Sequence, residues 1–153
     1  MDQDQHRASA RSLPWWGILA LVVLAAPRVV LHDLDLVHEG TVVNAVLVFV
    51  PPLVWIVTVV AWRVSRPLLT LVLVGLWYGV VLLVTHQLLW QSSLGGRDVS
   101  LGGNLAGLDP VLQQLVVRGF AAVSSLATGL LVGTVTGLVA WGVSAAAGRV
   151  RRG

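Results

Sequence analysis

Long apolar runs separated by short polar segments dominate the chain from residue 13 to residue 147. A helix that spans a bilayer needs about 20 consecutive, mostly apolar residues. Four segments meet that requirement, over residues 13–31, 42–62, 68–90 and 111–145, between an N-terminal tail (1–12) and a basic C-terminal tail (148–153). The pattern predicts an all-α, integral membrane four-helix bundle, with a long Gly-rich outer loop before the fourth helix.

The composition supports lipid as the solvent of this chain. Hydrophobic residues make up 56% and charged residues 11%, whereas soluble domains carry about 25% charged residues. The ten basic residues are all Arg and form no stripe with interleaved aromatic residues, so we expect no nucleic-acid partner. The absence of Cys excludes disulfides, thiolate metal sites and cysteine-based redox enzymes.

The distribution of Arg predicts the orientation in the membrane. The N-terminus, the Arg63–Arg66 turn and the C-terminus together carry seven Arg against two Asp, whereas the opposite side carries three Arg against five Asp or Glu. Basic residues accumulate on the cytoplasmic side of a membrane. We therefore expect a plasma-membrane protein with both termini in the cytoplasm. The shortness of the turn also makes the second and third helices antiparallel neighbours.

Two adjacent prolines, Pro51 and Pro52, lie near the centre of the second predicted helix. Each proline lacks a backbone donor, so the carbonyls of Leu47 and Val48 lose their usual partners. In lipid these carbonyls need another donor. A kinked helix is expected, and two interpretations of it remain open: a static kink filled by a neighbouring helix, or a hinge beside a carbonyl-lined site, as in transporters with broken helices.

Small residues recur at every fourth position of the last helix, where another backbone can approach closely. Gly75 and Gly79 form a matching patch on the third helix, and the two patches are expected to pack inside the bundle. A homo-oligomer or a membrane-protein partner that binds through the fourth helix is the alternative. The residues of the longer patch are Ala121, Ser125, Gly129, Gly133 and Gly137.

The loop before the fourth helix repeats Leu and Gly. It is either a flexible linker or a lid that rests on the bundle through Leu94, Leu101 and Leu108. At its end, Asp109 followed by Pro110 is typical of a helix N-cap with proline at the first helical position. The fourth helix is therefore expected to begin well outside the hydrocarbon.

Polar side chains gather at the outer ends of the predicted helices. Three interpretations compete: a solvated loop with Arg28 reaching the interface, a small-ligand or ion site, and a metal or haem site that uses His32, His38 and His86 with nearby carboxylates. If the first helix continues to Glu39, its polar residues share one face. The candidate ligand-binding residues are Arg28, His32, Asp35, Glu39, Asn44, His86 and Arg118.

Function is predicted mainly by elimination. No Asp or Glu lies inside a predicted span, which argues against carriers with a buried carboxylate as the proton site. The zinc-protease, phosphate-loop and nucleophile-elbow motifs are missing. We expect a binding, transport or accessory subunit without a cofactor, in which Arg28 faces the interior and is held by Asp35, Glu39 or the Thr85–Gln87 turn. A membrane enzyme or a metal- or haem-binding protein is the alternative.

The charge distribution generates a test of topology. Reporter proteins fused after Arg152 or inserted in the Arg63–Arg66 turn should be active in the cytoplasm, because the positive segments stay there. Reporters inserted near Glu39 and Gly102 should be active outside. A C-terminal reporter that is active only outside the cell would contradict the four-span model.

Overall fold

Four long helices make up most of the computed structural model, which describes residues 11–93 and 100–150; no strand occurs in those two ranges. A short helix and a 3-10 turn, Gly103–Leu105, lie in the last loop. All four long helices are long and apolar enough to cross a bilayer, which confirms the predicted helix content. The helices are α1 (Trp15–Asp33), α2 (Val42–Ala61), α3 (Pro67–Leu88), the short α4 (Trp90–Ser93) and α5 (Pro110–Val150).

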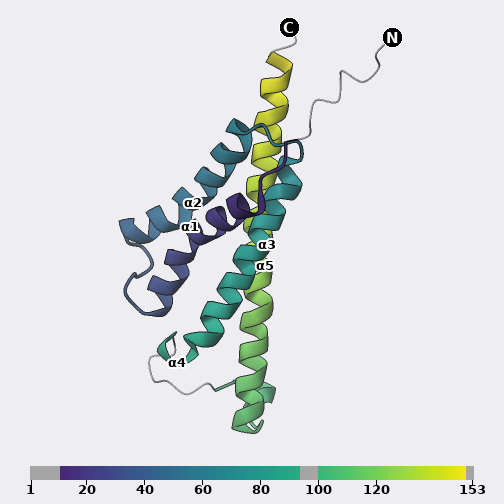
Figure 1. Ribbon diagram of the computed structural model, residues 1–153. Helices are drawn as coiled ribbons and strands as arrows, with labels where there is room; N and C mark the ends of the chain where they lie inside the picture. The colour runs from purple at the N-terminus through teal and green to yellow at the C-terminus, as the bar shows by residue number, and fades with distance from the viewer. Residues whose placement is uncertain (1–10, 94–99, 151–153) are drawn as a thin grey trace, which may run out of the picture.

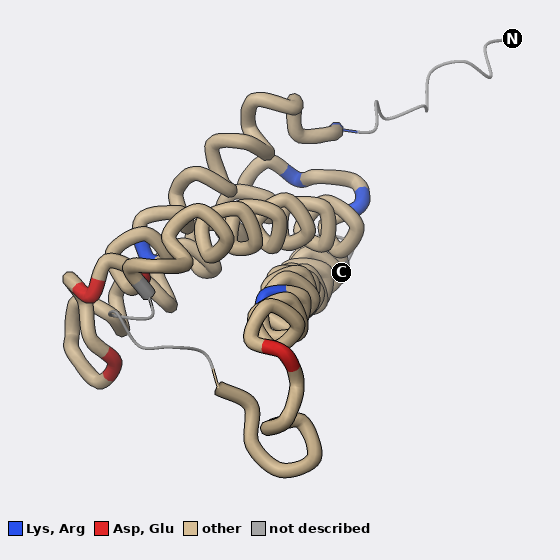
Figure 2. The backbone as a smooth tube through the Cα atoms, turned by 90° about the horizontal axis from the view of Figure 1, so that it is seen from below, with Lys and Arg blue, Asp and Glu red and all other residues tan. Residues whose placement is uncertain are grey.

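Successive long helices run in opposite directions, so α1 begins at the same end of the molecule at which α5 ends (Figure 1). We call this the basic end. The Arg11 carbonyl accepts hydrogen bonds there from the backbone N–H and the hydroxyl of Ser65, between Arg63 and Arg66. The opposite end, which faces the viewer in Figure 2, is the acidic end. Its described carboxylates are Asp33, Asp35, Glu39 and Asp109.

Helix α1 ends at Asp33 and does not continue to Glu39. Asp35 adopts a left-handed conformation with φ 57°. Its N–H donates to the His32 carbonyl, and the Leu36 N–H donates to the Leu31 carbonyl. This is the hydrogen-bond pattern of a Schellman motif, which closes a helix by satisfying its last carbonyls. The condition for a shared polar face as far as Glu39, that the first helix continues to that residue, is therefore not met.

Helix α2 passes through Pro51 and Pro52 without a break in its helical assignment. Both residues lie inside the helix, and Pro51 is buried. Trp55, one turn later, has no exposed surface and donates its indole N–H to the Leu21 carbonyl of α1 at 2.8 Å. The indole ring also packs edge-on against Tyr78 of α3, with ring centroids 5.9 Å apart. Trp55 thus joins three helices at the middle of the bundle.

Helices α3 and α5 share the most extensive contact in the fold. A Cβ added at Gly133 would lie 2.5 Å from the Leu71 carbonyl oxygen and 2.8 Å from the Gly75 Cα. One added at Gly129 would lie 2.5 Å from the Gly79 backbone nitrogen. The two backbones are therefore in direct contact at these residues, which is the geometry that small residues at four-residue spacing allow.

Helix α5 is 41 residues long and extends past α3 at both ends (Figure 1). It begins as expected at Pro110, where the Asp109 carboxylate accepts from the Val111 N–H at 2.8 Å. Gln113 fastens the preceding loop to this first part of α5, because its side chain bonds the Leu101 N–H and the Leu108 carbonyl. The described part of the loop lies against the start of α5; Leu94, part of the lid interpretation, is outside the described residues.

The backbone contact predicts a sharp difference between two glycines of α5. Gly133→Ala places a methyl group against the α3 backbone and should destabilise the fold by about 1–3 kcal/mol. Gly142→Ala is the matched control, because nothing lies within 4 Å of its added Cβ. Thermal unfolding in mild detergent measures both variants. Equal melting temperatures for the two would show that α3 and α5 are not in contact at Gly133.

Candidate functional site

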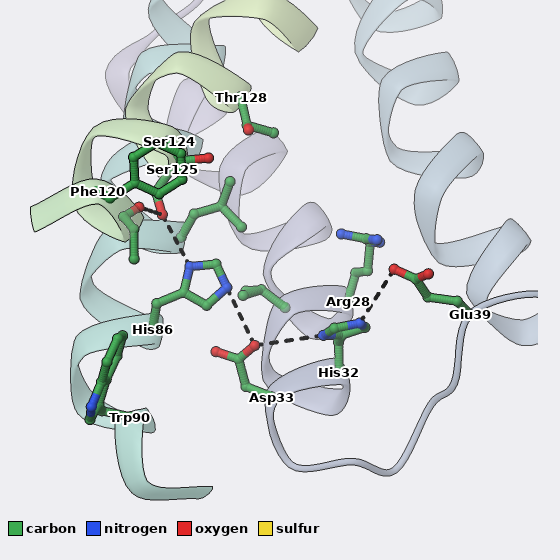
Figure 3. A pocket seen from close by; sticks show the side chains of 13 residues that line it. Arg28, His32, Asp33, Glu39, His86, Trp90, Phe120, Ser124, Ser125 and Thr128 are labelled. Atoms are coloured by element: carbon green, nitrogen blue, oxygen red, sulfur yellow. Dashed lines mark hydrogen bonds and ion pairs between the residues drawn. The ribbon is translucent and has the colours of Figure 1, made fainter. Parts of the chain in front are cut away.

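A pocket with an accessible volume of about 410 Å³ opens at the acidic end between α1, α3 and α5. Its floor and walls include apolar side chains such as Val29, Leu82 and Phe120. Its polar lining comes from all three helices and from the α1–α2 loop (Figure 3). We call it the polar pocket; its polar side chains are Arg28, His32, Asp33, Glu39, His86, Ser124, Ser125 and Thr128.

Asp33 is the central acid of the polar pocket. It is 4% exposed, and its Oδ1 lies 3.3 Å from Nε2 of His86 and 3.7 Å from Nδ1 of His32. Its Oδ2 is shielded and has no hydrogen-bond partner among the described residues. An unpaired buried polar atom costs about 1–3 kcal/mol. The last residue of α1 is therefore a buried carboxylate. Its presence weakens the earlier argument against carriers that use a buried carboxylate as the proton site.

His86 connects Asp33 to helix α5. Its Nδ1 lies 3.0 Å from the Ser125 hydroxyl oxygen, which is also 2.8 Å from the Ala121 carbonyl. If Ser125 donates to Ala121, Nδ1 donates to Ser125; if Ser125 instead donates to Nδ1, the ring accepts there and can donate from Nε2 to Asp33. The rotation of the Ser125 hydroxyl and the tautomer of His86 are therefore linked.

His32 extends the same chain of polar contacts toward the loop. Its Nε2 lies 3.9 Å from a carboxylate oxygen of Glu39, whose side chain is 82% exposed. Glu39, His32, Asp33, His86 and Ser125 thus form a continuous series from the surface to the buried face of α5 (Figure 3). The series therefore joins α1, α3 and α5 through ionisable and hydroxyl side chains.

Arg28 lies deeper than this series and faces the interior, as expected. Its guanidinium interacts with the hydroxyl of Tyr78 on α3. Its Nε is shielded and lacks a partner within the described ranges. The acceptor differs from the expected ones, because Asp35 is turned into solvent by the end of α1 and instead lies 3.3 Å from His38. The first helix is too short to present Asp35 on the Arg28 face.

A second cavity of about 200 Å³ lies beside Pro51 and Pro52, and we call it the proline cavity. Arg28 and Thr128 line both this cavity and the polar pocket. Leu47 and Val48, whose carbonyls lose their helical donors to the prolines, also line it. Trp55, which is fully buried, forms part of its wall. Arg28 and Thr128 therefore separate the two cavities and line both of them.

Three of the predicted ligand-binding residues lie away from the polar pocket. Asp35 is in the helix-ending turn. Asn44 is in the first turn of α2, where its N–H donates to the Thr41 hydroxyl. Arg118 donates to the Gln87 carbonyl and lies over the ring of Trp90 at 5.1 Å, which ties α5 to the end of α3. Ligand binding by these three residues stays a prediction, whereas Arg28, His32, Glu39 and His86 line the pocket together.

Sequence reasoning missed Asp33 as a pocket residue. The signal was available, because Leu21, Ala25, Val29 and Asp33 follow one another at four-residue spacing and are all buried in α1. Four-residue spacing keeps side chains on one helical face, so an acid that continues a buried stripe faces the interior. Ser125 was assigned to packing alone, although the same position also presents its hydroxyl to His86.

The Ser125–His86–Asp33 series has the residue types of a hydrolase triad but not its setting. Ser125 is 4% exposed and lies within α5, with its hydroxyl near the carbonyl one turn earlier. Backbone N–H groups inside a helix are already bonded to carbonyls, so they cannot form an oxyanion hole beside this serine. Across residues 11–93 and 100–150, no three His, Asp or Glu side chains are grouped as metal ligands.

A double-mutant cycle tests whether Asp33 and His86 form an energetically coupled pair. His86→Phe leaves the buried carboxylate poorly compensated, so it should cost much less stability when Asp33 is already Asn; we expect a coupling energy of about 0.5–3 kcal/mol. The Asp35–His38 pair has the same 3.3 Å separation but exposed side chains. Its cycle should give about 0–1 kcal/mol. Additive effects of Asp33→Asn and His86→Phe on unfolding in detergent would contradict the buried pair.

Comparisons with protein-family models, with curated proteins and with solved structures found no match for this chain. The functional argument consequently rests on the geometry of the polar pocket and on the physical chemistry of its lining.

Proposed function

We propose that this chain is a small multi-pass membrane protein that binds a small polar ligand in the polar pocket, as a binding, transport or accessory subunit. One observation carries the proposal: about 410 Å³ of space at the acidic end is lined by a basic residue, two histidines and two carboxylates. Ionisable groups between membrane helices are costly to bury, and they mark functional sites by default.

The proposed setting is the plasma membrane, with the basic end in the cytoplasm and the polar pocket open to the outside. Arg11, Arg63 and Arg66 at one end and the described carboxylates at the other support this orientation. An oligomer or a partner bound through α5 is also part of the proposal. Helix α3 covers Gly129 and Gly133 of α5. An oligomer or partner would therefore bind another face of α5, one with exposed side chains such as Leu131.

The two neighbouring cavities favour binding with access from the acidic end. Together their linings extend from Glu39 to the prolines of α2, where Trp55 forms part of the wall. Passage to the basic end would require this indole to leave its hydrogen bond with the Leu21 carbonyl. Transport would therefore use the same binding site and would also require Trp55 to move. The enzyme and metal alternatives have weaker support, given the helical setting of Ser125.

A bulky residue in the pocket tests the proposal. Ser124 lines the pocket and is exposed, so Ser124→Trp should fill space needed by a ligand without disturbing the α3 contact. Val135→Trp, at a 52% exposed position outside the pocket lining, is the matched control. Native mass spectrometry after gentle purification should show a bound mass on wild type and Val135→Trp that Ser124→Trp lacks. Identical bound masses for all three proteins would refute a ligand in this pocket.

A further inference from the structure

Two polar groups of opposite charge on the wall of the polar pocket have unused hydrogen-bonding capacity. Oδ2 of Asp33 is an acceptor, and Nε of Arg28 is a donor; both are shielded and lack a partner in the part of the chain that the structure describes. Asp33 itself is 4% exposed. Buried polar groups are normally paired, so the Asp33 and Arg28 side chains on the pocket wall retain hydrogen-bonding capacity that the chain itself does not use.

The polar pocket and the proline cavity are arranged in a definite order along the helix axes. Asp33 is the last residue of α1, and Arg28, five residues earlier, lies about 7.5 Å deeper along the axis. Glu39 belongs to the following loop (Figure 3). Beneath Arg28, the proline cavity is walled largely by apolar residues such as Ala25, Leu47 and Val132. From the acidic end inward, the order is acid, base, apolar space.

We infer that the polar pocket binds a zwitterionic phosphate ester that carries a primary ammonium group. The ammonium group lies against Asp33, and the phosphate lies against Arg28. This inference rests on the proposed function, because it names the ligand class of the same pocket. The chemistry has two sources: the headgroup of an aminophospholipid and free ethanolamine phosphate.

Each contact has a physical reason. A primary ammonium has three N–H donors for carboxylate acceptors, and a guanidinium matches the oxygens of a phosphate. The terminal torsion of an aspartate is soft, so the Asp33 carboxylate can turn Oδ2 toward the cavity. The hydroxyls of Ser124 and Thr128 lie on the α5 wall beside the phosphate position.

The surroundings of the pocket favour the lipid source. In an outer-leaflet aminophospholipid, the ammonium lies outside the phosphate, which matches the order of Asp33 and then Arg28 from the acidic end inward. Phe120 lines the pocket and is 75% exposed, and Val123 beside it is 68% exposed. In a membrane this apolar surface of α5 is adjacent to acyl chains, so a lipid headgroup can enter the pocket while its tails remain in the bilayer.

Headgroup competition tests the inference. Phosphatidylethanolamine, phosphatidylcholine and phosphatidylglycerol with identical acyl chains are added separately to the full chain in mild detergent, and bound lipid is measured by native mass spectrometry. Choline keeps the positive charge but has no N–H donor, and glycerol has no charge. Wild type should bind phosphatidylethanolamine about tenfold more tightly than the other two, the change expected when a charge-assisted hydrogen bond is lost.

Two variants assign the contacts. Asp33→Asn should abolish the preference for ethanolamine over choline, whereas Arg28→Gln should weaken binding of all three lipids, because all three carry the phosphate. Asp109→Asn and Arg63→Gln, which change the same charges outside the pocket, should leave the preference intact. An unchanged preference in Asp33→Asn, or equal binding of the ethanolamine and choline lipids to wild type, overturns the inference.

Calorimetry with ethanolamine phosphate separates the two sources. Binding of the soluble compound as tight as that of the lipid assigns the site to the free zwitterion, and much weaker binding assigns it to the lipid; both support the recognition chemistry. If none of these compounds binds but Ser124→Trp still loses a different bound mass, the zwitterion inference fails and the proposed function stands. If Ser124→Trp retains every bound mass, both fail.

Discussion

Direct backbone contact between α3 and α5 sets the position of the polar groups that these two helices contribute to the pocket. Gly75 and Gly79 on one helix, and Gly129 and Gly133 on the other, remove the side chains that would hold the helices apart. The same helical face of α5 then carries Ser125 to within 3.0 Å of His86. A wider separation of these helices would break that contact and leave His86 without its partner on α5. The polar site therefore depends on the glycine contact between the two helices.

Burial makes this arrangement of charges costly. In a low-dielectric medium, a charge is tolerated only with compensating partners, and Asp33 has two histidines near one oxygen and nothing described near the other. Arg28 is similar, with Tyr78 as its partner on one side. Incomplete compensation of this kind lowers stability, and the proposed ligand would supply the missing partners.

Much of the fold follows from the sequence because membrane helices obey simple rules of length and polarity. The four apolar segments, the Asp109–Pro110 helix start and the small-residue ribbon were all readable from residue types and spacing. The end of α1 was not, because it depends on one left-handed residue, Asp35, and aspartate adopts that conformation only occasionally. That single turn removes Asp35 from the predicted site and leaves Asp33 as the acid of the pocket.

The pocket itself was predictable only in part. Spacing along one helix places Arg28 and His32 near one another, but it cannot say which residue of a different helix lies opposite. The pairing of His86 with Ser125 depends on how far α3 slides along α5, and the partner of Arg28 depends on Tyr78 reaching across from α3. Both contacts depend on how neighbouring helices are aligned along their axes. This alignment is set by side-chain packing between helices and cannot be read from residue spacing within one helix.

Helix α5 is one continuous rod that joins the two ends of the molecule. Its 41 residues correspond to about 60 Å, roughly twice the thickness of a hydrocarbon core. Its contact with α3 runs from Gly137 beside Leu68 to Arg118 beside Gln87. A shift of α5 along its own axis at the polar pocket is therefore carried to the basic end by the same helix.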